Sequence, residues 1–311
     1  MRNSPPMKSL KRLFCLATVA SGALLCAQMP AGLHRPAAVP DGYVVTPFGY
    51  YHPSCVVHLA KGDTVVNDGP AIQHADGTFD NIPACNYPRY TARGEVVTAG
   101  AAELPTISWS WIETIYATTN TSYGGVIETW NVPPNPTSHD GQTVYFFPGL
   151  EGGLTILQPV LGWNADFGNA WGIASWQAGA QGSGIAIEST PRRVSVGDLI
   201  VGEVMSNCSS GTLSCPTWFV MTEDAGKGST TLPSTTSYGQ TFYWAAAGTL
   251  EVYNLVQCSD YPSNGSLAFN GALYDNNFEP INVPGWSLEV WPNLTPQCNY
   301  GGQVAGVTLD Y

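Results

Sequence analysis

Basic residues are scarce in this chain of 311 residues, which holds 11 Lys and Arg against 23 Asp and Glu and has a formal net charge of −12. From residue 101 to the end, three cations (Arg192, Arg193 and Lys227) face 17 acidic residues. A surface of this sign repels phosphate backbones and anionic lipids, so we expect neither nucleic acid nor a membrane as a partner. Such a surface also has few ion pairs that acid could break, which fits a protein that works in an acidic environment. An equal alternative is that the negative charge only keeps the protein soluble.

Long apolar runs are also missing, apart from Leu13–Leu25, which follows Lys8, Lys11 and Arg12. This run is too short to cross a bilayer, but a cationic start followed by a short apolar stretch is typical of a secretory signal peptide. We therefore expect residues 1–27 to be a signal peptide and the protein to be secreted.

The sequence lacks the usual motifs of hydrolases that use an activated serine or cysteine nucleophile. No Gly-X-Ser-X-Gly motif occurs, and the single histidine after residue 100 is His139, so hydrolysis that depends on histidine is not expected. Six cysteines follow the leader, an even number in an oxidising compartment, and none has zinc-ligand spacing with histidine. Six cysteines allow 15 pairings. Proximity in sequence suggests the pairs Cys55–Cys85, Cys208–Cys215 and Cys258–Cys298.

No window after residue 100 shows a sustained helical period. Residues 101–311 instead contain many short segments rich in aromatic and β-branched residues, bounded by Gly, Pro, Asn, Asp and Ser. Examples are 125–132, 143–147, 184–188, 199–204, 217–221, 241–244, 249–256, 266–269 and 304–309. This composition predicts an all-β domain, a two-sheet antiparallel β-sandwich or jelly roll.

Residues 28–100 differ from the rest of the chain, because they are nearly neutral and contain four of the five histidines, His34, His52, His58 and His74. We place a domain boundary near Gly100 and treat 28–100 as an N-terminal extension. It is either a pro-segment that covers the main domain until acidification or a permanently attached β-rich cap. Histidine changes charge between pH 5 and 8, which slightly favours the first alternative.

The most specific pattern lies in three segments, the first of which is Val126-Ile-Glu-Thr-Trp-Asn-Val-Pro-Pro134. The second is Thr143-Val-Tyr-Phe-Phe-Pro-Gly-Leu-Glu-Gly-Gly-Leu-Thr-Ile-Leu-Gln158, and the third is Gly248-Thr-Leu-Glu-Val-Tyr-Asn-Leu255, followed by Asn264-Gly-Ser-Leu-Ala-Phe269. Together they resemble the eqolisin, or glutamic peptidase, family. In that family an aromatic-X-X-Gly-hydrophobic-acid-Gly stretch leads to Ile-Leu-Gln, and a later strand carries a catalytic Glu.

The resemblance implies a concanavalin-like sandwich and a secreted, acid-active endopeptidase that acts on polypeptides without a metal or cofactor. It places Gln158 on the catalytic glutamine and Glu251 on the catalytic glutamate. Glu251 would remove a proton from the attacking water, and the Gln158 amide would donate to the oxyanion. The resemblance also makes Glu151, Trp163, Trp171 and Trp176 candidate substrate-binding residues, and we expect a monomer.

Elementary strand geometry bears on the two proposed catalytic residues. Alternation in a strand places Glu251 on the same face as Tyr253 and Leu255, where a carboxylate is partly desolvated. Gln158 ends an apolar run, where its amide needs hydrogen-bond partners. Both residues also fit purely structural roles. The alternative function is a carbohydrate-binding or catalytically silent β-sandwich, which would need exposed tryptophans on a platform rather than Gln158 and Glu251 in one groove.

Overall fold

The structure is a computed structural model that describes residues 35–66, 71–97, 111–152, 155–178, 184–236, 241–282, 284–291 and 294–311. The predicted signal peptide, Trp109 and the predicted boundary near Gly100 lie outside these residues. Within them the chain is almost entirely β-sheet, with two short 3-10 turns, η1 (Pro53–Cys55) and η2 (Cys258–Asp260). None of the described segments forms a helix with the length and apolarity needed to span a bilayer.

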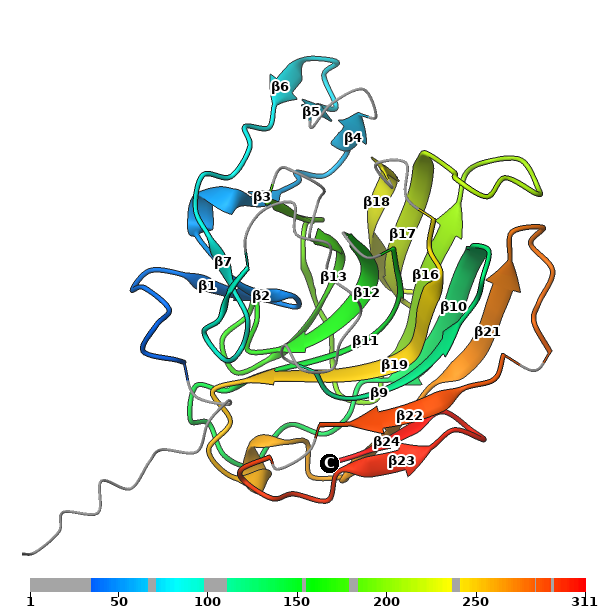
Figure 1. Ribbon diagram of the computed structural model, residues 1–311. Coiled ribbons are helices and arrows are strands. Elements are labelled where there is room, and N and C mark those ends of the chain that lie inside the picture. The colour runs from blue at the N-terminus through cyan, green and yellow to red at the C-terminus, as the bar shows by residue number, and fades with distance from the viewer. Residues whose placement is uncertain are drawn as a thin grey trace, which may run out of the picture.

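Two antiparallel sheets form the main body (Figure 1). The five-stranded sheet has the order β18 (Gly228–Thr236), β17 (Thr217–Asp224), β16 (Leu199–Ser206), β10 (Tyr123–Asn131) and β21 (Asn270–Asp275). The nine-stranded sheet has the order β22 (Ser287–Val290), β9 (Trp111–Thr118), β19 (Trp244–Tyr253), β11 (Thr143–Glu151), β12 (Ile156–Trp163), β13 (Trp171–Ala178), β14 (Ala186–Glu188) and β3 (Val56–His58), while β15 (Arg192–Arg193) also pairs with β13. The sandwich predicted from the sequence is therefore confirmed.

The two sheets pack through alternate side chains of their strands. A Cβ atom built on Gly202 in β16 would lie 2.7 Å from Pro159 of β12, and the hydroxyl of Ser175 in β13 lies 3.0 Å from that of Thr222 in β17. Because successive side chains of a strand point to opposite faces, Gln158 and Trp176 lie on the face turned away from the five-stranded sheet. We call this second face of the nine-stranded sheet the site face.

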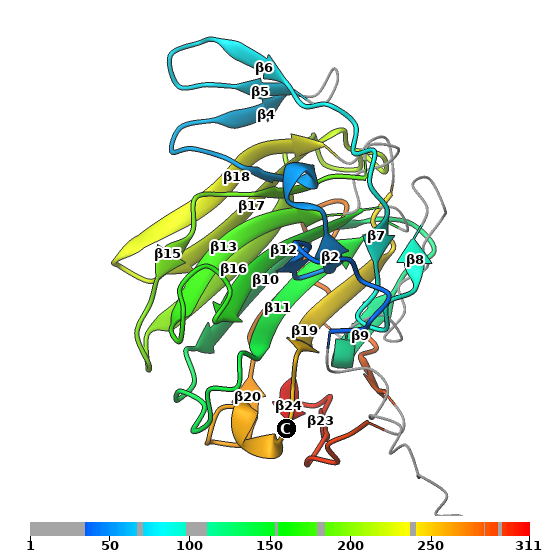
Figure 2. The same cartoon turned by 90° about the vertical axis from the view of Figure 1, so that its left-hand side faces the viewer.

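The N-terminal extension covers the site face. Its strands β1 (Val44–Thr46), β2 (Gly49–Tyr51), β7 (Arg89–Tyr90) and β8 (Val96–Val97) form one small sheet, and β4 (Thr64–Val66), β5 (Ala71–Gln73) and β6 (Phe79–Asn81) form another. Strand β3 pairs in parallel with β14 and so extends the main sheet. Figure 2 shows β2 in front of β11 and β12, with β4, β5 and β6 at the upper end of the molecule. The extension thus packs as part of the fold; its removal on maturation stays a prediction.

A third small sheet, with the order β20 (Ser266–Ala268), β24 (Thr308–Asp310) and β23 (Gly301–Gln303), brings the C-terminus against the main body. The disulfides pair Cys55 with Cys85, Cys208 with Cys215 and Cys258 with Cys298. All three pairs agree with those suggested by sequence proximity.

Strand prediction succeeded where aromatic and β-branched residues dominate and failed elsewhere. The predicted segments 241–244 and 249–256 both overlap one strand, β19, since Ala245–Gly248 continue the ladder between them through a bulge. Eight described strands of residues 101–311 lie outside the segments named from the sequence: β9, β12, β13, β15, β18, β21, β22 and β23. Strands β12 and β13 contain Gly, Pro and Ala, which weaken the local signal, and they are held by neighbours on both sides.

Candidate functional site

Gln158 occupies the middle of the site face and is completely buried. Its Nε2 donates a hydrogen bond of 2.9 Å to the main-chain carbonyl of Pro47. Its Oε1 has no partner among the described residues, although it is buried as well. The side chain lies over Gly149 of β11, since a Cβ atom built there would be 3.6 Å from the Cγ of Gln158. The amide thus binds one peptide carbonyl and keeps a second polar atom available for a water or a peptide N–H.

Pro47 lies in the tight turn between β1 and β2, and several contacts hold this turn on the site face. Arg89 Nη1 donates to the carbonyl of Phe48 at 2.6 Å, and its guanidinium lies 4.3 Å from the Phe48 ring centroid. Tyr50 packs edge-on against Tyr253 of β19, with ring centroids 5.1 Å apart. The β1–β2 hairpin therefore closes the site in this state of the molecule.

Glu151 is the carboxylate nearest to Gln158 by strand register. It pairs with Ile156, and Gln158 lies two residues further along β12 on the same face. Cβ atoms of such diagonal neighbours lie about 7–8 Å apart or somewhat less, within reach of two long side chains. Glu151 is 3 % exposed and also pairs with Trp244 on β19. The register thus makes Glu151, predicted as a substrate-binding residue, a diagonal neighbour of Gln158 on the site face.

Glu251 lies on the site face, as Gln158 does, but the two residues are at different positions along their strands. It pairs with Tyr145 on β11, and Tyr145 pairs with Gly162, which is four residues from Gln158 on β12. The two residues are therefore separated by roughly 10 Å across the strands and roughly 13 Å along them. Such a separation is too large for both side chains to hold one water, so the structure does not bring the predicted dyad together.

Glu251 has its own local partner. The hydroxyl of Tyr253 donates to Glu251 Oε1 at 2.5 Å, and both residues are buried. This contact agrees with the alternation argument, which placed Glu251 and Tyr253 on one face.

The three tryptophans predicted to line the substrate site divide between the two faces. Trp176 pairs directly with Gln158 and is 4 % exposed, so it lies beside the amide. Trp163 and Trp171 pair with each other and are offset from Gln158 and Trp176 by odd numbers of residues. Strand alternation therefore turns them to the opposite face, where they belong to the buried core. Their assignment to the substrate site is corrected: sequence proximity to Gln158 did not determine the face.

Sequence reasoning missed an acidic group on the other side of Trp176. Glu188 of β14 pairs with Trp176, and desolvation raises its pKa to about 7. Desolvation, followed by the charge of Glu188, raises the pKa of Asp166 to about 8. His58 Nδ1 of the extension lies 2.6 Å from Glu188 Oε2. No sequence signal identifies this group, because its members come from a strand, a loop and the extension.

Tyr145 connects this acidic group with Glu251. It is buried, and its pKa is raised well above the ordinary value by desolvation and then by the charges of Asp166, Glu251 and Glu188. The site face thus carries a neutral phenol among carboxyl groups. Among the described residues, no group of three His, Cys, Asp or Glu side chains is arranged to hold a metal ion.

Comparison with solved structures finds similarity to glutamic peptidases. Scytalido-glutamic peptidase, solved with a transition state analog inhibitor, is 15% identical to this chain with a TM-score of 0.46, and the match covers 64% of this chain and 96% of that one. SCP-B, a member of the eqolisin family solved with the tripeptide Ala-Ile-His, is 18% identical with a TM-score of 0.42 and the same coverage. No family model and no curated protein sequence matches the chain. These structural neighbours come from the same family that the sequence motifs resemble.

Proposed function

We propose that the protein is a secreted acid endopeptidase that hydrolyses polypeptides at the site face. The observation that carries this proposal is the hydrogen bond from the Gln158 amide to the carbonyl of Pro47. A side-chain amide that already holds a main-chain carbonyl, in a site closed to water, is suited to hold the carbonyl of a substrate. The same donor then stabilises the negative charge that develops on the oxygen during attack.

In this proposal a carboxylate on the site face removes a proton from water as the water oxygen attacks the carbonyl carbon. Glu151 is the base that the register favours, because it is the diagonal neighbour of Gln158. The buried Oε1 of Gln158 accepts a hydrogen bond from the water and orients it. The protonated carboxyl then delivers its proton to the leaving nitrogen as the C–N bond breaks, which returns the carboxylate to its starting state.

The N-terminal extension acts as a pro-segment in this proposal. Gln158 is fully buried, and the Pro47 carbonyl accepts the hydrogen bond that this proposal assigns to the substrate carbonyl. The hairpin β1–β2 must therefore leave the site face before a polypeptide can bind. The alternative, a permanently attached cap, would keep the chain inactive.

The carbohydrate-binding alternative lacks structural support in the described part of the chain. Eight tryptophans there are buried, and Trp286 is half-buried, so none offers an exposed platform on which a sugar ring could stack.

The test is proteolysis of a reduced, denatured protein substrate from pH 2 to 7, with peptide products identified by mass spectrometry. The intact chain should be compared with a chain cut at a protease site introduced between residues 97 and 111. We expect the cut chain to digest the substrate in acid and the intact chain to be slower. Absence of acid proteolysis from both forms would contradict the proposal and leave the silent β-sandwich alternative.

A further inference from the structure

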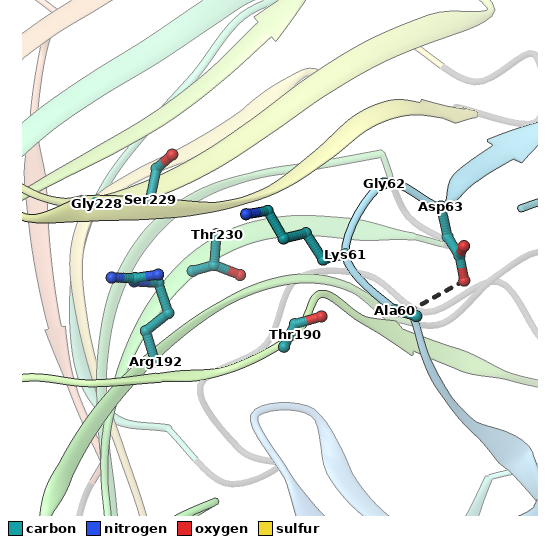
Figure 3. Close-up of a pocket in the computed structure, with 9 residues that line it drawn as sticks. All are labelled: Ala60, Lys61, Gly62, Asp63, Thr190, Arg192, Gly228, Ser229 and Thr230. Carbon is teal, nitrogen blue, oxygen red and sulfur yellow. Dashed lines mark hydrogen bonds between the residues drawn. The ribbon is translucent and has the colours of Figure 1, made fainter. Parts of the chain in front are cut away.

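A cavity of about 530 Å³ lies between the extension and the main body, away from Gln158. Its walls come from three places in the chain: the loop before β4, the segment around β15 and the start of β18. The residues that line it are Ala60, Lys61, Gly62, Asp63, Thr190, Arg192, Gly228, Ser229 and Thr230 (Figure 3). A cavity of this size accommodates a small organic ligand and exceeds what a simple ion needs.

Two cations converge on this cavity in a chain that has few of them. Lys61 reaches it from the extension and Arg192 from β15, and Figure 3 shows their side chains on either side of Thr230. Neither cation forms an ion pair with any described residue. Lys227, by contrast, is paired with Asp198 and Asp224. The charge of Lys61 and Arg192 is therefore available to an anion.

The arginine is also held in position. Its Nη2 donates to the carbonyl of Lys227 at 3.3 Å, which leaves other N–H groups of the guanidinium free to bind a ligand. Gly228 makes this position possible, because a Cβ atom built there would lie 2.7 Å from Arg192 Nη2.

The one carboxylate in the lining is occupied by other groups. Asp63 Oδ2 accepts from the backbone N–H of Ala60 at 3.1 Å, and its Oδ1 lies 3.2 Å from His74 Nδ1. Hydrogen bonds with Asp80 and Asp63 raise the pKa of His74, so the histidine carries positive charge beside Asp63 in mild acid. Asp63 thus does not cancel the two cations at the cavity.

Hydroxyl groups complete the lining. Thr190 Oγ1 donates to the carbonyl of Leu59 at 2.7 Å and keeps its oxygen lone pairs as acceptors. Ser229 is exposed, and its hydroxyl has no hydrogen-bond partner among the described residues. Thr230 lies between the two cations, and its hydroxyl shares a hydrogen bond with that of Ser189. Hydroxyl-rich walls around a cationic pair match a ligand that has one anionic group and several hydroxyl groups.

We propose that this cavity binds an anionic monosaccharide, with its carboxylate or phosphate between Lys61 and Arg192 and its ring hydroxyls against Thr190, Ser229 and Thr230. Arginine presents a planar set of donors that suits either anionic group, and lysine adds a mobile charge. Because Lys61 belongs to the extension and Arg192 to the main body, the ligand bridges the two parts. By mass action it stabilises the state in which the extension is docked.

Calorimetric titration of the intact chain near pH 6 and at low salt tests the proposal. The probes are glucuronate and glucose 6-phosphate, which distinguish carboxylate from phosphate, with glucose and inorganic phosphate as controls. We expect at least one anionic sugar to bind about tenfold or more tightly than either control, the range expected for added charge-assisted hydrogen bonds. Affinity for glucose or inorganic phosphate equal to that for both anionic sugars would overturn the proposal, as would the absence of saturable binding.

Arg193 supplies the matched control variant. It is adjacent to Arg192, carries the same charge and lies instead 5.2 Å from the Phe167 ring centroid. We expect Lys61→Ala and Arg192→Ala each to lower affinity about tenfold, and Arg193→Ala to leave it within about twofold. If Arg192→Ala and Arg193→Ala lowered the affinity equally, the effect would come from the overall positive charge, and the proposed site would be overturned. Melting temperatures of the unliganded variants show that each is folded.

Discussion

The amide of Gln158 donates to the carbonyl of Pro47 across 2.9 Å, so that a residue of the extension occupies the position that the proposed substrate carbonyl must take. Inhibition and substrate recognition therefore use the same atom, Nε2 of Gln158. A change that loosens the turn around Pro47 should expose this atom without altering the main sheet.

Gly49→Ala provides such a change. Gly49 has a φ of +116°, and a Cβ atom built on it would lie 2.5 Å from the carbonyl oxygen of Tyr90. Strain of about 1–3 kcal/mol at this position opens the hairpin roughly fivefold to a hundredfold more often. We expect faster hydrogen exchange in residues 44–51 and, in the intact chain, faster acid proteolysis.

The control for this experiment is Gly42→Ala, at a position with a φ of +86° and no atom within 4 Å of the built Cβ. It introduces backbone strain without the collision at Tyr90. Equal exchange in the two variants would show that the turn around Pro47 does not depend on Gly49.

Stability should fall as the pH rises above 5, because buried acids on both sheets favour the neutral form. Burial raises the pKa of Glu113 to about 9 and that of Glu128 to about 8, from an ordinary value of 4.5 in each case. At a pH below the pKa of these groups in the unfolded chain, both the folded and the unfolded state hold the proton. Between that pKa and the raised pKa of the folded state, only the folded state holds it. The stability that these groups contribute is therefore complete in acid, is lost progressively from about pH 5 upward, and is gone once the pH has passed the folded pKa values of about 8 and 9.

Thermal unfolding from pH 5 to 8 measures this effect, with Glu128→Gln as the test variant. Glutamine keeps the shape of the side chain but does not titrate. The melting temperature of the variant should therefore depend less on pH than that of the native chain. In the free energy of unfolding, the difference in slope amounts to up to about 1.4 kcal/mol per pH unit. Glu289→Gln, at an exposed position of β22, should leave the slope unchanged. A melting temperature that rises from pH 5 to 8 would contradict the prediction.

The histidines of the extension differ in their partners, which bears on the pH response of the extension. His52 stacks on Tyr87 and His74 pairs with Asp63 and Asp80, all within the extension, so that among the described histidines of the extension only His58 forms an ion pair with the main body. Its partner Glu188 has a pKa raised by desolvation to about 7, so the negative charge of Glu188 is lost as the pH falls through neutrality.

We therefore expect His58→Ala to loosen the extension more near pH 7 than at pH 3, where Glu188 is neutral. Hydrogen exchange in β3 of the variant and the native chain, compared at the two values, measures this difference. If the variant exchanges faster than the native chain by the same factor at both pH values, His58 does not hold the extension through its charge.

The sequence predicted the fold better than the site, and the reason is geometric. Strand alternation correctly placed Glu251 with Tyr253 and required a partner for Gln158, since both depend on local geometry. Distance between residues on different strands depends on register, which a bulge at Ala246 and Gly248 of β19 shifts. Register arises from pairing between segments distant in sequence, so Glu151 rather than Glu251 lies beside Gln158.

The tryptophans divide for the same geometric reason. Trp163 and Trp171 lie close to Gln158 in the sequence but have the opposite parity along their strands, whereas Trp176 has the matching parity. Strand β13 was not predicted because Gly172, Ala174 and Ser175 weaken its local signal. Without the strand, the faces of its residues could not be assigned.

The catalytic proposal is tested most directly by the two glutamates. Glu151→Gln keeps hydrogen-bonding capacity but cannot accept a proton, so we expect acid proteolysis to fall by at least about 10²-fold. Gln158→Ala removes the oxyanion donor and should cost on the order of 10²- to 10³-fold. Glu251→Gln retains an acceptor for the Tyr253 hydroxyl and lies outside the reach of Gln158, so its activity should stay within about tenfold of the native value.

Rates on the cut chain, compared with melting temperatures, distinguish loss of chemistry from loss of folded protein. Inactive Glu251→Gln beside active Glu151→Gln would restore the pairing of Gln158 with Glu251 that the sequence predicts, and would require the sheet to rearrange when substrate binds.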